Sequence, residues 1–268
     1  MITTRTIIAK YKSVDNRVIQ STHVFGRYLY VGTGPEGIVY RTLDGTSNLE
    51  FYKVGDMYAT AIADYGNALF VGTSPNGRIM MHNFNTGNRF HYVTTGDYKV
   101  TAFEVHDNKL YAGTSPSGLI LSFDGTDWRM EYDAYGGGIK AMVSHGGSLY
   151  VFVEGIESIP VLNSSGWSML KDGDDFFSIS TFSKVTTSLA TLEKNENFDV
   201  SFSCAVSFDD KLYFAPENRC NLYEYDGTDV KIAGQWEGEK IRSLDVVGAD
   251  QLLVAVDDMV YIMEGAND

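Results

Sequence analysis

Near-identical segments recur along this chain at a regular interval. Three of them read YLYVGTGPEGIVY from Tyr28, ALFVGTSPNGRIM from Ala68 and KLYAGTSPSGLIL from Lys109, so they begin 40 and 41 residues apart. Weaker copies begin at Ser148, Lys211 and Gln251, with spacings of 39, 63 and 40 residues. A period of this length predicts a series of equivalent supersecondary units that bury their apolar faces on one another.

Each unit divides into four short extended pieces, which the third copy shows best. Its predicted strands are 100–105, 109–113, 119–123 and 128–132, and Asp124-Gly125 is a two-residue hairpin signal because both residues tolerate positive φ angles. Tyr and Phe number 17 and 15, which also favours strands. Four antiparallel strands repeating about every 40 residues are typical of β-propeller blades. The predicted fold is therefore an all-β propeller with six four-stranded antiparallel blades.

The two ends of the chain are predicted to share one blade. The last copy ends near Glu264 after three strands, and Thr3–Tyr11 is strand-like, so we expect this segment to complete the last blade and close the ring. A single propeller domain then spans residues 1–268, with 1–15 as the closing strand. Blades are expected at about 17–56, 57–97, 98–136, 137–175, 199–239 and 240–268. A seventh, degenerate blade inside the 63-residue spacing is the alternative.

The first strand of each unit carries a mostly small residue at one position. Ten residues before Val31 and its equivalents stand Ser21, Ala61, Ala102, Ala141, Cys204 and Leu244. Strands nearest a propeller axis are crowded, so small side chains are expected there. These six segments are therefore predicted to be the innermost strands of the blades.

The long spacing contains an insertion, residues 176–198, that the propeller itself does not require. Insertions on a repeat scaffold form loops on one face and often carry binding. The side chains predicted to contact a partner protein are Phe176, Phe177, Phe182, Lys184, Leu189, Leu192, Lys194 and Phe198. An inert surface loop is the alternative.

The turn motif VGTxPxG has a structural and a functional interpretation. Proline fixes φ, the following glycine permits a positive φ, and the threonine hydroxyl can bond the local backbone. Alternatively Thr33, Thr73 and Thr114 contact a sugar or peptide ligand on one face. The neighbouring residues differ between the copies (Glu36, Asn76 and Ser117), whereas equivalent pockets would favour the same residue. The structural interpretation is favoured.

Charge and composition narrow the range of partners. Asp and Glu number 35 against 21 Lys and Arg, giving a net charge of −14, which disfavours nucleic acid. No stretch approaches the ~18 apolar residues of a membrane span, and the first residues, MITTRTIIAKYKSVDNR, do not resemble a signal peptide. We therefore expect cytoplasmic synthesis without a signal peptide and no membrane partner.

Motifs for catalysis, cofactors and metals are absent from the sequence. The five histidines and two cysteines have no zinc-like spacing, and no nucleophile elbow, P-loop or dinucleotide fingerprint occurs. The acidic groups Asp172-Gly-Asp174-Asp175, Asp209-Asp210 and Asp257-Asp258 are expected to be solvated turn charges. A pair of carboxylates brought together at the axis stays open. We predict no catalytic residue, no metal and no cofactor.

The segments YLYVGTGPEGIVYRTLDG and KLYAGTSPSGLILSFDGTDW resemble the blade repeats of kelch-like and related bacterial and viral β-propellers. The resemblance implies a non-enzymatic structural or adaptor protein that contacts other proteins, most readily a tail, fibre or decoration component of a bacteriophage virion. A carbohydrate-binding propeller used in surface recognition is one alternative. A lyase or hydrolase with an axial acidic site is another, and it predicts that His or carboxylate side chains converge at the axis.

Overall fold

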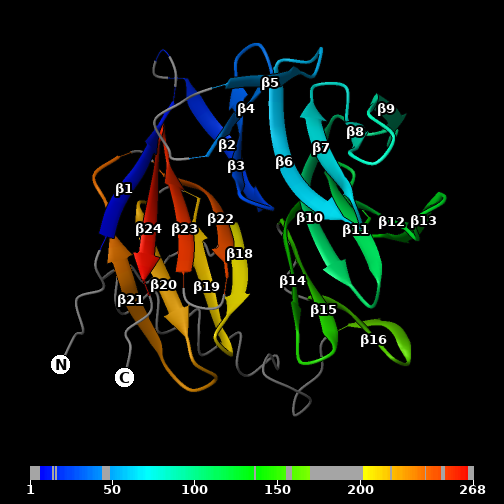
Figure 1. Cartoon of the computed structure of the whole chain (residues 1–268). Coiled ribbons are helices and arrows are strands. Elements are labelled where there is room, and N and C mark those ends of the chain that lie inside the picture. The colour runs from blue at the N-terminus through cyan, green and yellow to red at the C-terminus, as the bar shows by residue number, and fades with distance from the viewer. Residues whose placement is uncertain are drawn as a thin grey trace.

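The computed structural model describes residues 7–13, 15, 17–43, 49–135, 137–154, 159–169, 202–217, 219–238, 240–248 and 251–264. Within these ranges 24 strands form six four-stranded antiparallel sheets, and no helix is present (Figure 1). The innermost strands contact one another in a closed order, β2–β6–β10–β14–β18–β22 and back to β2. The prediction of an all-β, six-bladed propeller is confirmed.

The first three blades follow one pattern, with the innermost strand first in the chain. Blade 1 contains β2 (Val18–Phe25), β3 (Tyr28–Gly34), β4 (Ile38–Thr42) and β5 (Leu49–Lys53). Blade 2 contains β6 (Tyr58–Tyr65), β7 (Ala68–Ser74), β8 (Arg78–Asn83) and β9 (Asn88–Thr94). Blade 3 contains β10 (Lys99–His106), β11 (Lys109–Ser115), β12 (Leu119–Phe123) and β13 (Trp128–Asp133).

The remaining blades complete the ring. Blade 4 contains β14 (Ile139–His145), β15 (Ser148–Val153), β16 (Pro160–Asn163) and β17 (Gly166–Met169). Blade 5 contains β18 (Phe202–Phe208), β19 (Lys211–Pro216), β20 (Asn221–Tyr225) and β21 (Val230–Gln235). Blade 6 contains β22 (Ile241–Val247), β23 (Gln251–Val256), β24 (Met259–Glu264) and, from the other end of the chain, β1 (Ile7–Lys12).

The N-terminal segment closes the ring as the sequence predicted. β1 runs antiparallel to β24, from the pair Ile7–Met263 to the pair Lys12–Met259, and a hydrogen bond from Ser13 N to Asp258 O (2.8 Å) follows the last pair. Figure 1 shows β1 beside β24. Without β1, the outer edge of β24 would present unpaired backbone groups to solvent, and this pairing satisfies them.

Two local expectations were wrong. Phe123 pairs with Trp128, so the turn that begins at Asp124-Gly125 has four residues rather than two. The carboxylate of Asp124 accepts hydrogen bonds from the backbone N–H groups of Thr126 and Asp127 (3.0 and 3.1 Å), and this wider turn therefore closes the hairpin. The strand predicted at 119–123 has the bounds expected, and its three neighbours extend one or two residues further.

The second error concerns the innermost strand of blade 6. Ser243 pairs with Ala255 as Ser21 pairs with Gly32, so Ser243 and not Leu244 occupies the small-residue position. Val247 and Gln251 close the β22–β23 hairpin with three residues between them, one more than in blade 1, which shifts the repeat by one position. All six positions therefore hold small residues.

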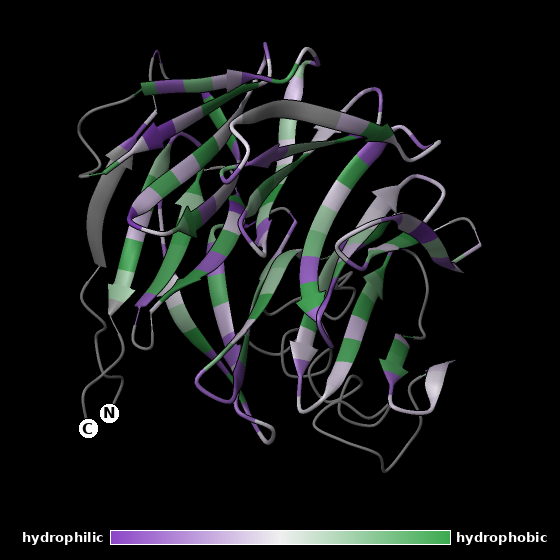
Figure 2. Cartoon of the chain, turned by 45° about the vertical axis from the view of Figure 1, so that its right-hand side comes forward, coloured by the Kyte–Doolittle hydropathy of each residue, from purple (hydrophilic) through white to green (hydrophobic). Residues whose placement is uncertain are grey.

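Apolar side chains pack between neighbouring blades. The cluster between blades 2 and 3 joins Phe70 and Ile79 to Val100, Leu110 and Ala112, all buried. Figure 2 shows hydrophobic bands repeating along the strands of each blade. At Gly72 an added Cβ would lie 2.6 Å from Val100 Cγ1, so this glycine of the VGT motif serves the close approach of two blades. None of the described segments is a helix long and apolar enough to cross a bilayer.

The predicted insertion 176–198 falls within residues 170–201, which lie outside the described residues. The partner-contact side chains predicted there, from Phe176 to Phe198, therefore stay predictions. The chain leaves blade 4 at Met169 and re-enters blade 5 at Phe202, at the start of an innermost strand.

Candidate functional site: the axial channel

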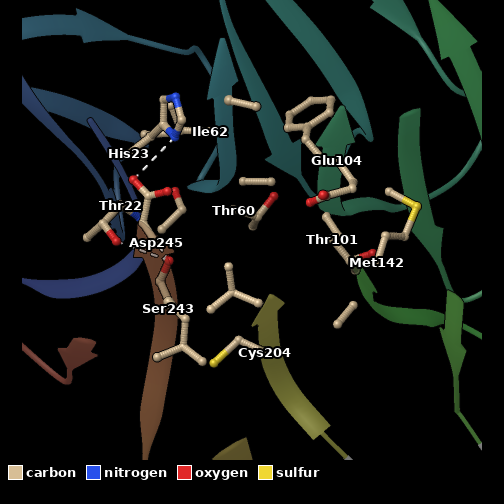
Figure 3. A pocket seen from close by; sticks show the side chains of 18 of the residues that line it. Thr22, His23, Thr60, Ile62, Thr101, Glu104, Met142, Cys204, Ser243 and Asp245 are labelled. Atoms are coloured by element: carbon tan, nitrogen blue, oxygen red, sulfur yellow. Dashed lines mark hydrogen bonds and ion pairs between the residues drawn. The ribbon is translucent and has the colours of Figure 1, made fainter. Parts of the chain in front are cut away.

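A β-bulge at the same position of every innermost strand opens the axis of the ring. The strand register shifts once in each inner hairpin, and the extra residue is Gln20, Thr60, Thr101, Lys140, Ser203 or Arg242. A bulge re-aims a side chain that regular pairing would direct elsewhere. Here all six side chains line the same cavity, and Figure 3 shows two of them, Thr60 and Thr101. Thr60 Oγ1 also donates to Val100 O (2.5 Å) and Ser203 Oγ to Ile241 O (2.9 Å), which ties neighbouring blades together.

The channel has two connected parts. The larger has a volume of about 290 Å³ and is lined by residues of all six innermost strands, including the small residues next to the bulges. In Figure 3 the side chains of Thr60 and Glu104 are directed at this common space. The smaller part, about 120 Å³, lies at one end and is lined by the bulge residues together with the residues just outside them.

This smaller cavity opens on the face of the ring that carries the VGTxPxG turns, which we call the turn face. It consists of the turns at 35–37, 75–77 and 116–118 and of the connections that lead into β6, β10 and β14. Hydrogen bonds join the two sets, for example from Gly37 N to Met57 O (2.7 Å) and from Ala134 N to Gly118 O (3.0 Å). Lys99 and Ile139, the first residues of β10 and β14, line the cavity, which fixes its position on this face.

Positive charge gathers at this opening. Four cationic side chains line the small cavity, and we call them the cationic mouth: Lys99, Lys140, Lys240 and Arg242. Lys140 Nζ lies 2.9 Å from Glu217 Oε1 and 3.1 Å from Glu154 Oε1, and Arg242 lies 3.6 Å from Asp257 Oδ1. The whole chain has a net charge of −14, so a cluster of four cations contrasts with its overall negative charge.

Lys99 and Lys240 differ from the other two cations. Among the described residues, neither forms an ion pair with a carboxylate. Burial, together with the nearby charges of Lys240 and Lys140, holds the pKa of Lys99 below its usual value. Burial and the charge of Arg242 likewise lower the pKa of Lys240. The two amines therefore repel one another in a partly desolvated site.

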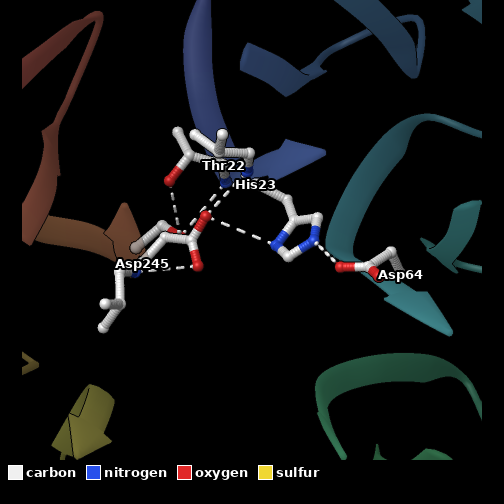
Figure 4. Close-up of polar contacts among 7 residues, drawn as sticks. Thr22, His23, Asp64 and Asp245 are labelled. Carbon is white, nitrogen blue, oxygen red and sulfur yellow. Dashed lines mark hydrogen bonds and ion pairs between the residues drawn. The ribbon is translucent and has the colours of Figure 1, made fainter. Parts of the chain in front are cut away.

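Deeper in the channel a histidine lies between two carboxylates from neighbouring blades. His23 Nε2 is 2.7 Å from Asp64 Oδ1 of blade 2, and His23 Nδ1 is 3.3 Å from Asp245 Oδ2 of blade 6 (Figure 4). Asp245 is held in turn by the backbone N–H of Val24 (2.8 Å). Burial alone would lower the pKa of His23, but interactions with Asp245 and Asp64 outweigh it and raise the pKa to about 9. His23 is therefore an imidazolium at neutral pH.

Glu104 of blade 3 lines the same part of the channel. Burial raises its pKa to about 8, although the backbone N–H of Ser144 donates to Oε1 (3.0 Å) and favours the carboxylate; the charge of Asp245 adds to the increase. At neutral pH this side chain holds a proton, so it can act as a hydrogen-bond donor or a general acid.

The other ionisable groups of the channel do not suggest a metal or thiol site. Within the described ranges, no three His, Cys, Asp or Glu side chains converge as metal ligands would. Cys204 lines the channel but burial raises the pKa of its thiol to about 12, so it is not a thiolate at neutral pH. Neither Cys204 nor Cys220 forms a disulfide.

The turn-motif threonines lie in the framework rather than on its surface. Thr33, Thr73 and Thr114 are completely buried. Thr114 Oγ1 donates to Asp97 Oδ2 (2.7 Å) and accepts from Leu119 N (3.0 Å), while Thr33 Oγ1 donates to Ile38 O (2.9 Å). Thr73 Oγ1 likewise donates a hydrogen bond to Asp56 Oδ2. These hydroxyls stabilise the turns, and none has exposed surface for a ligand.

The residues that converge in the channel were not singled out from the sequence. His23, Glu104 and Asp245 occupy one repeat position, which Ala63, Val143 and Val206 hold in the other blades. Three titratable residues at a repeat position that is otherwise apolar could have indicated this site from the sequence. Asp245 was not aligned with His23 and Glu104, because the extra residue in the turn of blade 6 shifts the repeat by one position.

Comparisons with known proteins define the fold and leave the function open. No known protein family matches the chain, and no curated protein matches it in sequence. Among solved structures, the WD40 repeats of RRP9 superpose with a TM-score of 0.66 at 10% identity, covering 97% of this chain and 99% of that one. A luciferin-regenerating enzyme gives 0.65 at 11% identity, covering 98% and 96%.

A third structure, of a nidogen/laminin complex, gives a TM-score of 0.59 at 15% identity, covering 82% of each chain. Identities this low show the propeller fold alone. The same fold therefore occurs both in an enzyme and in a protein complex, and the kelch-like resemblance stays a prediction.

Proposed function

We propose that this protein is a non-enzymatic adaptor that binds another protein on its turn face. The observation that carries the proposal is the exposure of three large apolar side chains there, each from a connection between two successive blades. Met57, Tyr98 and Tyr135 are 49%, 60% and 89% exposed. Tyrosine is enriched among the residues that dominate binding energy in protein interfaces.

The propeller fold commonly mediates protein–protein interaction, and a closed ring presents its loops without a large cost of ordering. The cationic mouth lies on the same face, beside Tyr98, because Lys99 follows it in the chain. Opposite charges across an interface speed association and exclude wrong partners. The proposed partner segment is therefore acidic, with apolar side chains that pack on Met57, Tyr98 and Tyr135.

A place in a bacteriophage virion is the finer form of this proposal. It is supported by the resemblance of the repeats to those of viral and bacterial propellers. A glycan ligand at Thr33, Thr73 and Thr114 is less well supported, since their hydroxyls are buried and bonded within the turns.

A random peptide library displayed on yeast, sorted against the intact protein, tests the proposal. We expect the enriched peptides to carry clustered Asp and Glu beside apolar residues. They should lose binding to a variant with Met57→Ser, Tyr98→Ser and Tyr135→Ser. Enriched peptides that bind this variant as tightly as the wild type would contradict the proposal.

A second candidate function is acid–base catalysis in the channel, favoured by the convergence of His23, Asp245 and Glu104. Glu104 is protonated at neutral pH and would serve as the general acid of a lyase or hydrolase. Glu104→Gln keeps the shape and removes the acid. A turnover found in a substrate screen and abolished by Glu104→Gln, with folding unchanged, would establish this function; a turnover that Glu104→Gln leaves intact would remove it.

A further inference from the structure

The geometry of the cationic mouth points to a binding site for a small dianion, a phosphate or dicarboxylate group held between Lys99 and Lys240. Both side chains line the same cavity of about 120 Å³, at the turn-face end of the channel. The inference concerns a small molecule inside the ring, and it does not depend on the adaptor function proposed for the surrounding loops.

The charges of the mouth are only partly matched. Lys140 has carboxylate partners in Glu217 and Glu154, and Arg242 has one in Asp257. In the described part of the chain no carboxylate forms an ion pair with Lys99 or Lys240, although the charge of Glu217, which lines the same cavity, acts against the lowering of their pKa values. Among the described residues that line the cavity, Glu217 is the one carboxylate against four cations, so a ligand with two negative charges would offset the remaining positive charge.

This arrangement costs stability in the absence of a ligand. Burial and the charges of neighbouring cations lower the pKa of both lysines, which means that the protein environment disfavours their charged forms. The chain has 35 Asp and Glu residues, and several of them form ion pairs with other cations. None of the described carboxylates forms an ion pair with Lys99 or Lys240. Cations whose pKa is shifted by burial and by specific nearby charges in a cavity are candidates for a functional site.

The wall of the cavity also suits an oxyanion. Gln20 and Ser115 bring an amide and a hydroxyl to the same space, and both can donate hydrogen bonds. The hydroxyls of Thr60 and Ser203 are already used as donors to backbone carbonyls, so they shape the cavity rather than bind. Low-dielectric walls strengthen the field of the amines at the opening.

Isothermal titration calorimetry of the full chain at low salt tests the inference with inorganic phosphate, succinate and acetate. We expect phosphate and succinate to bind at least tenfold more tightly than acetate, because only they carry two charges. Whichever dianion binds more tightly identifies the ligand class. Equal, weak binding of all three would overturn the inference.

Charge-matched variants locate the site. Lys99→Gln with Lys240→Gln should weaken dianion binding at least tenfold, whereas Lys231→Gln, which removes an exposed charge on β21, should leave it unchanged. Thermal unfolding gives a second measurement. The mouth variant should melt at or above the wild-type temperature without anion and gain nothing from phosphate. A phosphate-induced increase equal to that of the wild type would contradict the assignment.

Discussion

His23 Nε2 lies 2.7 Å from Asp64 Oδ1, so an imidazolium of blade 1 is held by a carboxylate of blade 2 inside the channel. Asp245 of blade 6 approaches the other ring nitrogen at 3.3 Å. One side chain therefore links three consecutive blades across the point where the ring closes. Its protonation state affects the stability of that closure.

His23 makes the stability of the ring dependent on pH. Its pKa rises from 6.5 in the unfolded chain to about 9 in the folded protein, so its contribution is complete below pH 6.5 and is lost as the pH rises through about 9. The contribution is on the order of 3 kcal/mol. Urea unfolding at a series of pH values should show this loss in the wild type and not in His23→Gln.

Two controls separate this effect from others. His106, whose pKa burial lowers, contacts Ser144 and no carboxylate, so His106→Gln should preserve the wild-type loss between pH 6.5 and about 9. The pKa of Glu104 rises from 4.5 in the unfolded chain to about 8 in the folded protein, so the folded protein also becomes less stable as the pH rises through this range. Glu104→Gln should remove this loss and leave the loss due to His23 unchanged. An unchanged pH profile in His23→Gln would count against the ion pairs.

The pair Asp97–Thr114 is expected to stabilise the junction between blades 2 and 3. Asp97 Oδ2 accepts from Thr114 Oγ1 (2.7 Å) and from Ser117 N (2.9 Å). Asp97→Ala and Thr114→Val should each cost about 1–3 kcal/mol, because a buried polar group loses its partner. The double variant should cost less than the sum. Thr33→Val, whose hydroxyl donates only to Ile38 O, is the matched control and should not couple to Asp97.

Gly72 should tolerate no side chain while Val100 is present. A Cβ at Gly72 would lie 2.6 Å from Val100 Cγ1 and 2.7 Å from Val100 Cβ. Gly72→Ala is therefore expected to cost about 1–3 kcal/mol by overpacking. Val100→Ala should recover part of this loss in the double variant, as measured by urea unfolding. Additive effects of the two substitutions would show that the blades do not meet here as described.

Removing residues 1–12 should open the ring. The outer edge of β24 would lose its partner strand, leaving backbone groups beside Val260 and Ile262 free to pair with another chain. We expect lower thermal stability and concentration-dependent oligomers by light scattering. A synthetic peptide of residues 3–12 should restore the monomer. A truncated chain that stays monomeric and equally stable would show that β1 is dispensable.

Much of the fold can be predicted from this sequence because every blade repeats the same local pattern. The strand 119–123 was found from periodicity, and the closing segment from the fourth strand that the last blade lacks; the structure describes this closing strand as Ile7–Lys12. The shift at Ser243 could not be predicted, because it depends on one extra residue in the β22–β23 turn.

The site was harder to predict than the fold. Gln20, Lys140 and Arg242 line the channel only because a bulge displaces each of them, and a bulge leaves no residue pattern that periodicity detects. The contact between His23 and Asp245 joins residues far apart in sequence, and it exists only once the ring is closed. The turn motif was prominent in the sequence because its threonines stabilise the framework.

The most direct test of the adaptor proposal is the affinity of one selected acidic peptide for three forms of the protein, measured by fluorescence anisotropy. The wild type and a rim variant, Tyr92→Ser with Met130→Ser on the outer strands β9 and β13, should bind equally. The turn-face variant, Met57→Ser with Tyr98→Ser and Tyr135→Ser, should bind at least tenfold more weakly. Equal affinity for the turn-face variant, or a loss confined to the rim variant, would contradict the account.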